Sequence, residues 1–179
     1  HLYDREGGPY AGPQGEFPDN AIRFAALSWI AARIAREGLA GWKPDMLHAH
    51  DWQAGLAPAY LAYYGAGGVK SVMTIHNIAF QGWAPGHMLG ILRLPAHAFH
   101  SEALEYYGGI SSLKAGLMTA DWITTVSPSY AAELMRPDGC GLRLSQRFPW
   151  AVAFGFGLLH GLGFARALLE IGLPPGEVP

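Results

Sequence analysis

The chain has 179 residues, of which half are hydrophobic and 15% are charged, and its formal net charge at pH 7 is -2. This length is enough for one domain with a buried core, and the lack of a basic excess argues against nucleic acid as a partner. The single cysteine, Cys140, excludes an internal disulfide and a metal site built from cysteines alone, and it fits a cytoplasmic protein. Because the chain begins at His1, without an initiator methionine or a signal-peptide pattern, we expect a piece of a longer protein.

The N-terminal part of the chain changes from a loop to a helix near Asp19. His1 to Pro18 is rich in glycine and proline, which predicts little regular structure. The stretch that follows carries apolar residues at helical spacing between arginines, so we expect a helix with Asp19 as its N-cap and Gly38 at its end.

Two short apolar runs, Met46 to Trp52 and Ser71 to Asn77, predict buried strands, because each is brief and is preceded by residues that break regular structure. The segment Ala54 to Tyr64 between them is long enough for a crossover helix, so the two strands should be parallel neighbours. The polar residues that end both runs should then lie together at the carboxyl edge of the sheet, where open α/β sheets bind ligands.

The remaining elements complete an α/β pattern. Phe80 to His100 contains several glycines and prolines and should be mostly loop. Ser111 to Ala120 predicts a helix, and Asp121 to Ser127, which is rich in β-branched residues, predicts a third strand. Pro128 should be the first residue of a further helix that runs to about Met135, with a serine as its cap. The predicted fold is a partial Rossmann-like parallel sheet with flanking helices.

Asp51 and Trp52 form a candidate sugar-binding pair at the end of the first predicted strand. The carboxylate can accept hydrogen bonds from sugar hydroxyls, and the indole can cover the apolar face of a sugar ring. A structural alternative stays open, in which Asp51 caps a helix that starts at Gln53. The two roles do not exclude each other.

His76 ends the second predicted strand and is a candidate for direct contact with a ligand. A neutral imidazole can donate a hydrogen bond to a ligand hydroxyl near pH 7. Asn77 and Gln81 follow it and supply amide groups for further contacts.

His48 and His50 alternate along the first strand and therefore share one face, whereas Asp51 points to the other. Two histidines at this spacing can hold a divalent metal, and His76 on the next strand is a candidate third ligand. The position of Asp51 off this face argues against such a site, and we expect His48 to hydrogen-bond a neighbouring carbonyl instead.

The last part of the chain differs in character from the rest. Phe148 to Ala165 contains no charged residue, has a length of about that needed to span a bilayer as a helix, and carries Gly157 and Gly161 four residues apart, as in a helix-packing face. We therefore expect an apolar C-terminal helix, with membrane association through residues 148–165.

Five motifs, in order and at natural spacing, resemble the N-terminal domain of bacterial glycogen (starch) synthases. They are His1–Arg5, Pro44–Pro58, Thr74–Gly82, Gly109–Leu117 and Thr124–Tyr130. The resemblance covers residues 1–142, and several long motifs in one order are far more specific than a single pattern.

This resemblance implies half of a two-domain glucosyltransferase of the GT-B type. Such enzymes transfer glucose from ADP-glucose to the non-reducing end of an α-1,4-glucan with retention of configuration, and they need no metal or other cofactor. By motif match, His76 would contact the transferred glucose and Asp51 would lie on the acceptor side of the cleft. The opening strand with its Lys-Thr-Gly-Gly loop and the whole C-terminal domain have no counterpart here, so we expect this fragment to be inactive alone.

The tail resembles a different family. Within residues 148–175, Phe154–Ala165 and Glu170–Pro174 are similar to a membrane segment of hydrogenase and urease accessory proteins of the HupE/UreJ type, which are thought to handle nickel. This similarity implies that residues 143–179 have an origin unrelated to residues 1–142.

Three functions therefore remain to be weighed. The first is a glycogen synthase fragment joined near Gly141 to Ser145 to an unrelated apolar tail. The second is a membrane metal-transport accessory fragment in which the tail is the functional part. The third is a metal-dependent hydrolase built on His48, His50 and His76.

Overall fold

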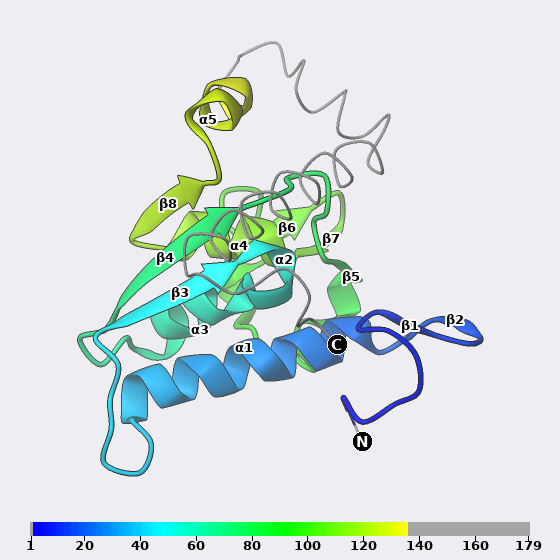
Figure 1. Cartoon of the computed structure of the whole chain (residues 1–179), viewed down its shortest axis with the longest axis horizontal. Coiled ribbons are helices and arrows are strands. Elements are labelled where there is room, and N and C mark those ends of the chain that lie inside the picture. Colours follow the sequence, from blue (N-terminus) through cyan, green and yellow to red (C-terminus); the bar gives the residue numbers. More distant parts are fainter. Residues whose placement is uncertain (1, 136–179) are drawn as a thin grey trace, which may run out of the picture. The chain divides into compact units, whose positions relative to one another are not determined.

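The computed structural model describes residues 2–135 (Figure 1). The predicted apolar helix at 148–165, the predicted domain 143–179 and the predicted junction at Gly141 to Ser145 lie outside the described residues. The chain divides into two compact units, His1–Ala131 and Ala132–Pro179, and the elements below belong to the first, except for the last described helix, which crosses the boundary. Among the described residues, none of the helices is both long enough and apolar enough to span a membrane.

The main sheet contains three parallel strands in the order β3 (Met46–His50), β4 (Lys70–Ile75) and β8 (Trp122–Thr125). All three strands and their parallel arrangement were predicted from the sequence. The first two are shorter at their carboxyl ends than predicted, because the chain turns into a helix or loop directly after His50 and Ile75.

Helices lie between the strands of the main sheet, as the sequence predicts. The crossover between β3 and β4 is divided into α2 (Asp51–Ala54) and α3 (Leu56–Tyr64), and α4 (Ser112–Thr119) precedes β8. The side chain of Ser111 caps α4 by accepting a hydrogen bond from the backbone N–H of Lys114, as expected for this residue type. Ser127 caps α5 (Pro128–Leu134) in the same way, through the N–H of Tyr130 at 3.1 Å.

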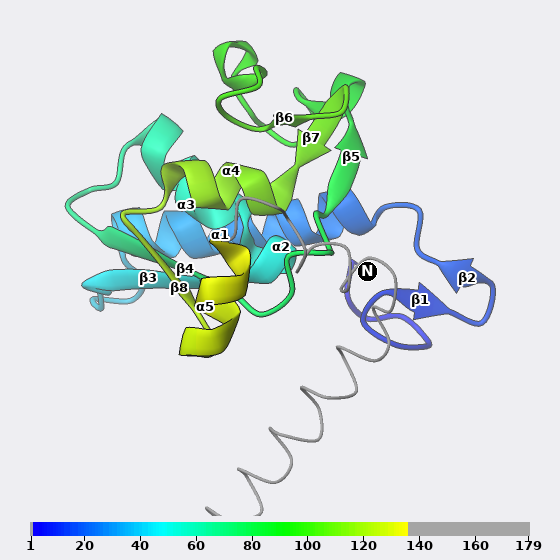
Figure 2. The ribbon, with the colours of Figure 1, turned by 90° about the horizontal axis from the view of Figure 1, so that it is seen from above.

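Helix α1 (Asn20–Glu37) lies with α3 and α4 on one side of the main sheet (Figure 2). Alternate residues of β3 are buried, and this inner face packs with the three helices in one apolar cluster. Members of the cluster include Ala32, Leu47, Met73, Leu61 and Leu113. The opposite face of β3 carries Met46, His48 and His50, which are exposed.

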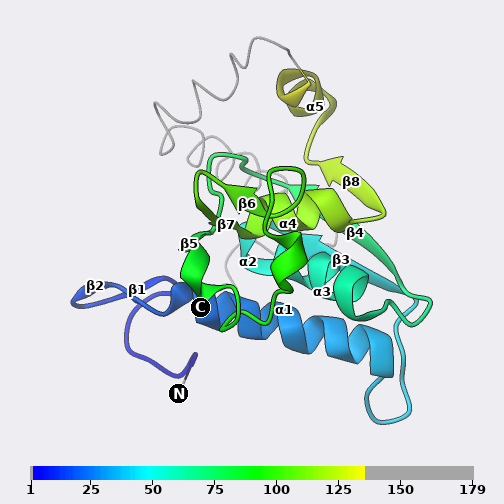
Figure 3. The same ribbon diagram turned by 180° about the vertical axis from the view of Figure 1, so that it is seen from behind.

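In the described part of the chain, five short strands lie outside the main sheet. A second sheet, seen from behind in Figure 3, is antiparallel and has the order β5 (Trp83–Pro85), β7 (Gly109–Ser111) and β6 (Glu105–Tyr106). Strands β1 (Ala11–Gly12) and β2 (Gly15–Glu16) form a small hairpin before α1. The 3-10 helices η1 (Gly86–Met88) and η2 (Ala96–Ala98) lie between β5 and β6. The strands in the segments predicted to be mostly loop or to have little regular structure thus have only two or three residues and show no periodic pattern in the sequence, and β6 lies where no element was predicted.

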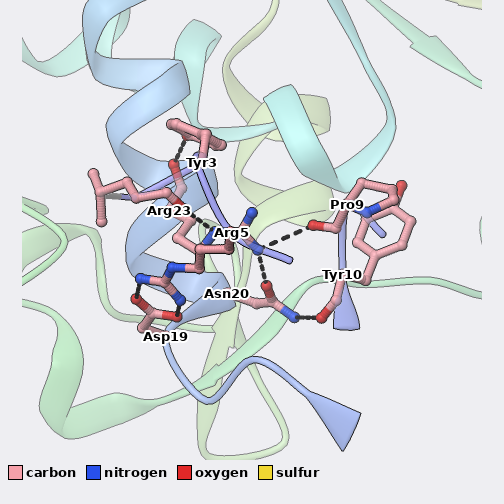
Figure 4. Close-up of polar contacts among 8 residues, drawn as sticks. Tyr3, Arg5, Pro9, Tyr10, Asp19, Asn20 and Arg23 are labelled. Carbon is pink, nitrogen blue, oxygen red and sulfur yellow. Dashed lines mark hydrogen bonds and ion pairs between the residues drawn. The ribbon is translucent and has the colours of Figure 1, made fainter. Parts of the chain in front are cut away.

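The N-terminal loop is anchored to α1 by a buried arginine (Figure 4). Arg23 is only 3% exposed, and its guanidinium donates to the backbone carbonyls of Leu2 at 2.7 Å and Pro9 at 3.0 Å and to Asn20 Oδ1 at 2.6 Å. Asn20 in turn donates through Nδ2 to the carbonyl of Tyr10 at 2.9 Å. These bonds place Tyr10 close to the start of α1.

Asp19 precedes α1 as predicted, but its side chain does not cap the helix. Both of its carboxylate oxygens accept hydrogen bonds from the Arg5 guanidinium at 2.7 Å. This ion pair holds the pKa of Asp19 below its usual range, and it adds a second attachment of the N-terminal loop to the helix.

Candidate functional site

The ends of β3 and β4 meet through the carboxylate of Asp51. Its Oδ1 accepts a hydrogen bond from the backbone N–H of His76 at 2.7 Å and another from that of Asn77 at 3.2 Å. Asp51 itself has a φ of 53°, in the left-handed region that side-chain-bearing residues seldom adopt. Because α2 begins at Asp51 itself, the alternative in which this residue caps a helix starting at Gln53 is wrong.

Three histidines gather beside this junction. The ring centroids of His48 and His50 are 4.2 Å apart, and His50 Nδ1 lies 3.0 Å from His76 Nε2. This N···N hydrogen bond needs one N–H and one lone pair, so His50 and His76 keep it only while at least one of the two rings is neutral. In residues 2–135, no group of three or more histidine, cysteine or acidic side chains is arranged to hold a metal ion.

His48 differs from the expectation in its hydrogen-bond partner. Its Nε2 lies 2.6 Å from the hydroxyl of Thr74 rather than near a carbonyl, and that hydroxyl is 2.6 Å from the hydroxyl of Thr124. Burial lowers the pKa of His48 from its ordinary value of 6.5, and the nearby His50 lowers it further. The neutral form of His48 is therefore favoured.

The loop after β4 is held by its own amide side chains. Asn77 Oδ1 accepts from the backbone N–H of Ala79 at 3.0 Å. Gln81 Nε2 donates to the carbonyl of Ile78 at 2.7 Å, and Gln81 Oε1 accepts from the hydroxyl of Ser111 at 2.8 Å. Both polar ends of Gln81 thus have protein partners, and these bonds fix the shape of the loop that carries His76.

Directly after Asp51, the chain lines an open groove of about 810 Å³, within the range of small-molecule sites. Trp52 and Gln81 line it, whereas His76, Asp51 and Asn77 are not part of its wall. Six aromatic side chains dominate the lining: Tyr10, Trp52, Phe80, Trp83, Tyr106 and Tyr107. The predicted site residues therefore fall into two adjoining groups, a cluster at the strand ends and part of an aromatic groove.

Trp52 is held firmly in the wall of the groove. Its ring contacts Phe24 edge-on with a centroid distance of 4.8 Å, and a Cβ atom on Gly82 would approach the indole to 2.5 Å. Only glycine fits at position 82, where φ is also positive at 60°. The ring centroids of Tyr10 and Trp52 are 6.0 Å apart, and the Tyr10 hydroxyl accepts a hydrogen bond from Gln53 Nε2 at 2.6 Å.

Sequence reasoning missed five of the six aromatic residues of the groove. Tyr10, Trp83 and Tyr107 each stand directly next to a proline or a glycine, and none of them lies in a segment that was predicted to be a helix or a strand. An aromatic ring in such a position has little chance of reaching the core, so this neighbourhood is the signal that could have identified them.

A parallel sheet with polar groups at its carboxyl edge and an aromatic groove is typical of α/β domains that bind small ligands. The family model described as the starch synthase catalytic domain matches residues 1–146. The chain therefore belongs to the starch synthase catalytic domain family, which confirms the resemblance found in the motifs.

Known proteins of this family match the chain closely. It is 77% identical over 145 residues to the glycogen synthase of Cereibacter sphaeroides, covering 80% of this chain and 30% of the relative. The glycogen synthase of Paracoccus denitrificans is 50% identical over 184 residues, covering 100% of this chain and 38% of the relative. The chain thus spans about a third of the length of these relatives.

A solved structure has the same fold. The catalytic domain of starch synthase IV from Arabidopsis thaliana, bound to ADP and acarbose, superposes with a TM-score of 0.61 and 26% sequence identity. The superposition covers 78% of this chain and 30% of that chain, and it confirms the α/β fold predicted from the sequence. A second family model, described as HupE / UreJ protein, matches residues 136–179, in agreement with the resemblance of the tail.

Proposed function

We propose that this chain is part of the N-terminal half of a retaining glucosyltransferase that moves glucose from ADP-glucose to the non-reducing end of an α-1,4-glucan. The observation that supports it most is the joining of the strand ends by Asp51, whose neighbour Trp52 lines a groove together with five other aromatic rings. Membership of the starch synthase catalytic domain family supports the same chemistry.

Each predicted residue has a role in this proposal. His76 contacts the glucose being transferred, and Asp51 fixes the backbone of His76 and Asn77 on the acceptor side. Trp52 covers the apolar face of an acceptor sugar, and Asn77 donates through its amide to sugar hydroxyls. Gln81 forms part of the groove wall. Its side chain already makes hydrogen bonds within the protein, and a bond to sugar would be additional to these.

The partners of the complete enzyme would be ADP-glucose and the glucan, in the cytoplasm. The Arabidopsis thaliana starch synthase IV structure contains ADP and acarbose, which supports a nucleotide and an oligosaccharide as ligands of this fold. A metal-dependent hydrolase has no support in residues 2–135, since they hold no suitable group of ligands.

The tail carries a second proposal. The match of residues 136–179 to the HupE / UreJ model favours association of residues 148–165 with a membrane, and it keeps open a membrane nickel-transport accessory role for that segment. This role would be independent of the sugar chemistry proposed for residues 1–142.

Glucosyl transfer can be tested in a hybrid enzyme. Residues 1–142 would replace the matching segment of the Cereibacter sphaeroides glycogen synthase, which is 77% identical over 145 residues. We expect transfer from ADP-glucose to glycogen by the hybrid, and none by the 179-residue chain alone, because groups that stabilise the leaving diphosphate would come from the rest of the enzyme.

In that hybrid, His76→Ala should lower the transfer rate by about 10²- to 10³-fold, the usual effect of removing one transition-state hydrogen bond. His87→Ala, at an exposed histidine of η1, is the matched control and should leave the rate unchanged. An unchanged rate in a folded His76→Ala hybrid would remove the proposed role of this histidine, and an inactive hybrid would contradict the proposed function.

A further inference from the structure

The outer part of the aromatic groove lies on the small antiparallel sheet, away from the strand ends that carry His76. Trp83 begins β5, Tyr106 ends β6, and Tyr107 follows it in the turn before β7. Trp83 is 53% exposed and Tyr107 is 86% exposed. Large rings with this much contact with water add little to the core, so folding does not explain their presence.

Trp83 is fixed in one orientation. Its indole Nε1 donates to the carbonyl of Tyr106 at 3.0 Å, which joins β5 to the turn after β6. The ring passes directly over Gly109, where a Cβ atom would collide with the indole. The hydrogen bond to Tyr106 and the lack of a side chain at Gly109 together keep this exposed ring in place.

Tyr107 is presented outward by a constrained turn. Its φ is 49°, and Gly108 follows with a φ of 76°, so the turn holds a tyrosine in a left-handed conformation. The N–H of Gly108 donates to Glu105 Oε1 at 2.7 Å, which closes the turn. The rings of Tyr106 and Tyr107 meet at 89° with centroids 4.6 Å apart.

We propose that Trp83, Tyr106 and Tyr107 form a holding platform that binds an α-glucan chain several sugar units away from the unit that reacts. The proposal rests on the function proposed above, because it extends the same groove beyond Trp52. Rings held rigidly in water can stack on the apolar faces of successive sugars at little cost in side-chain entropy.

The charges around the groove select a neutral polymer. Its lining in the described part of the chain includes Glu16 but no lysine or arginine. Aromatic platforms for single-stranded nucleic acid combine stacking with a positively charged groove, so this lining disfavours a polyphosphate chain. Amide groups of Asn20 and Gln53 on the lining suit hydroxyl-rich ligands instead.

The test compares a short and a long glucan on the full 179-residue chain, kept in solution by a detergent without a sugar headgroup, by isothermal titration calorimetry. We expect the disaccharide maltose to bind beside Trp52, and the longer maltoheptaose to reach the platform as well. Tyr107→Ala should weaken maltoheptaose binding by about 3- to 10-fold, the range expected for one lost aromatic contact, and should leave maltose binding unchanged. Tyr107→Phe should restore the affinity, because the ring and not the hydroxyl makes the contact.

Trp42→Ala is the matched control, because Trp42 is 62% exposed and is not part of the groove wall. It should leave the affinity for both sugars unchanged. If Tyr107→Ala and Trp83→Ala bind maltoheptaose as the wild type does, while Trp52→Ala does not, the proposed platform is refuted and the proposed function is still supported. If the folded wild-type chain binds neither sugar, both the proposed acceptor role of the groove and the proposed platform are refuted.

Discussion

Asp51 shows how a single residue can be held in an unfavourable conformation by the bonds that it makes. A left-handed backbone costs a side-chain-bearing residue about 1 to 2 kcal/mol, and Asp51 adopts it with a φ of 53°. In return, its carboxylate accepts from the N–H groups of His76 and Asn77 on the neighbouring strand end. Bonds to an ionised acceptor are stronger than neutral ones, so they offset the backbone cost.

Replacing this residue should separate the two effects. Asp51→Ala keeps the strain and removes both bonds, and it should lower the free energy of unfolding by about 2 to 4 kcal/mol. Asp51→Gly also removes the bonds but relieves the strain, and should be about 1 kcal/mol more stable than Asp51→Ala. Urea denaturation of the three proteins measures both differences, and equal stability of the wild type and Asp51→Ala would refute the account.

The candidate site could be predicted only where local sequence determines position. Asp51, His76 and Asn77 come together because parallel neighbouring strands end at one edge, which the apolar runs before them already indicate. Tyr10 reaches the groove through the bonds of Arg23 and Asn20, a tertiary arrangement with no local pattern.

At the scale of elements, β4 and β8 are joined at their starts by Asp121. Its carboxylate accepts from Lys70 Nζ at 2.6 Å and from the backbone N–H of Ser71 at 2.9 Å. The hydrogen bond from Lys70, followed by that from the Ser71 backbone, lowers the pKa of Asp121 from its ordinary value of 3.8. The ionised carboxylate therefore helps to hold the edge strand β8 to the sheet.

This contact predicts a dependence on pH. A carboxyl group whose pKa is lowered in the folded state stabilises that state at pH values above its unfolded-state pKa of about 3.8. This stabilisation is lost as the pH falls below 3.8 and through the lower pKa of the folded state. We expect Asp121→Asn to be less stable than the wild type at pH 7 and to lose less stability between pH 5 and pH 3.

Thermal unfolding midpoints at pH 7, 5 and 3 give the measurement. Asp45→Asn, at an exposed aspartate directly before β3, serves as the control and should follow the wild-type curve. Parallel curves for Asp121→Asn and the wild type would show that the contact between β4 and β8 adds nothing to stability.

Long elements with a clear sequence period could be predicted, whereas very short strands could not. The strands of the main sheet and helix α1 follow continuous apolar runs or helical spacing, and both appear where the sequence places them. The sheet β5-β7-β6 consists of strands of two or three residues. Pairing between distant segments creates such strands, so no single segment of sequence reveals them.

At the scale of the whole chain, the tail beyond residue 142 should dominate behaviour in solution. Phe148 to Ala165 has no charged residue, and exposed apolar segments promote association. We expect a version that ends at Leu142 to stay in solution at concentrations where the full chain aggregates or needs detergent.

Analytical ultracentrifugation of the two versions without detergent measures this difference. A full chain that carries Leu158→Lys and Leu162→Lys is the control, because it keeps the length of the tail and interrupts its apolar character. Lower solubility after truncation at Leu142 would show that the tail belongs to the fold of residues 1–142, contrary to the proposed separate origin.

The anchor formed by Arg23 has a consequence for the evolution and engineering of the groove. Its guanidinium holds the N-terminal loop through the carbonyls of Leu2 and Pro9, which every amino acid possesses. The backbone carbonyl of Tyr10 is bound by Asn20 in the same way, so the side chain at position 10 can change without loss of these backbone attachments. Substitutions at Tyr10 offer a way to alter the choice of ligand while the scaffold stays intact.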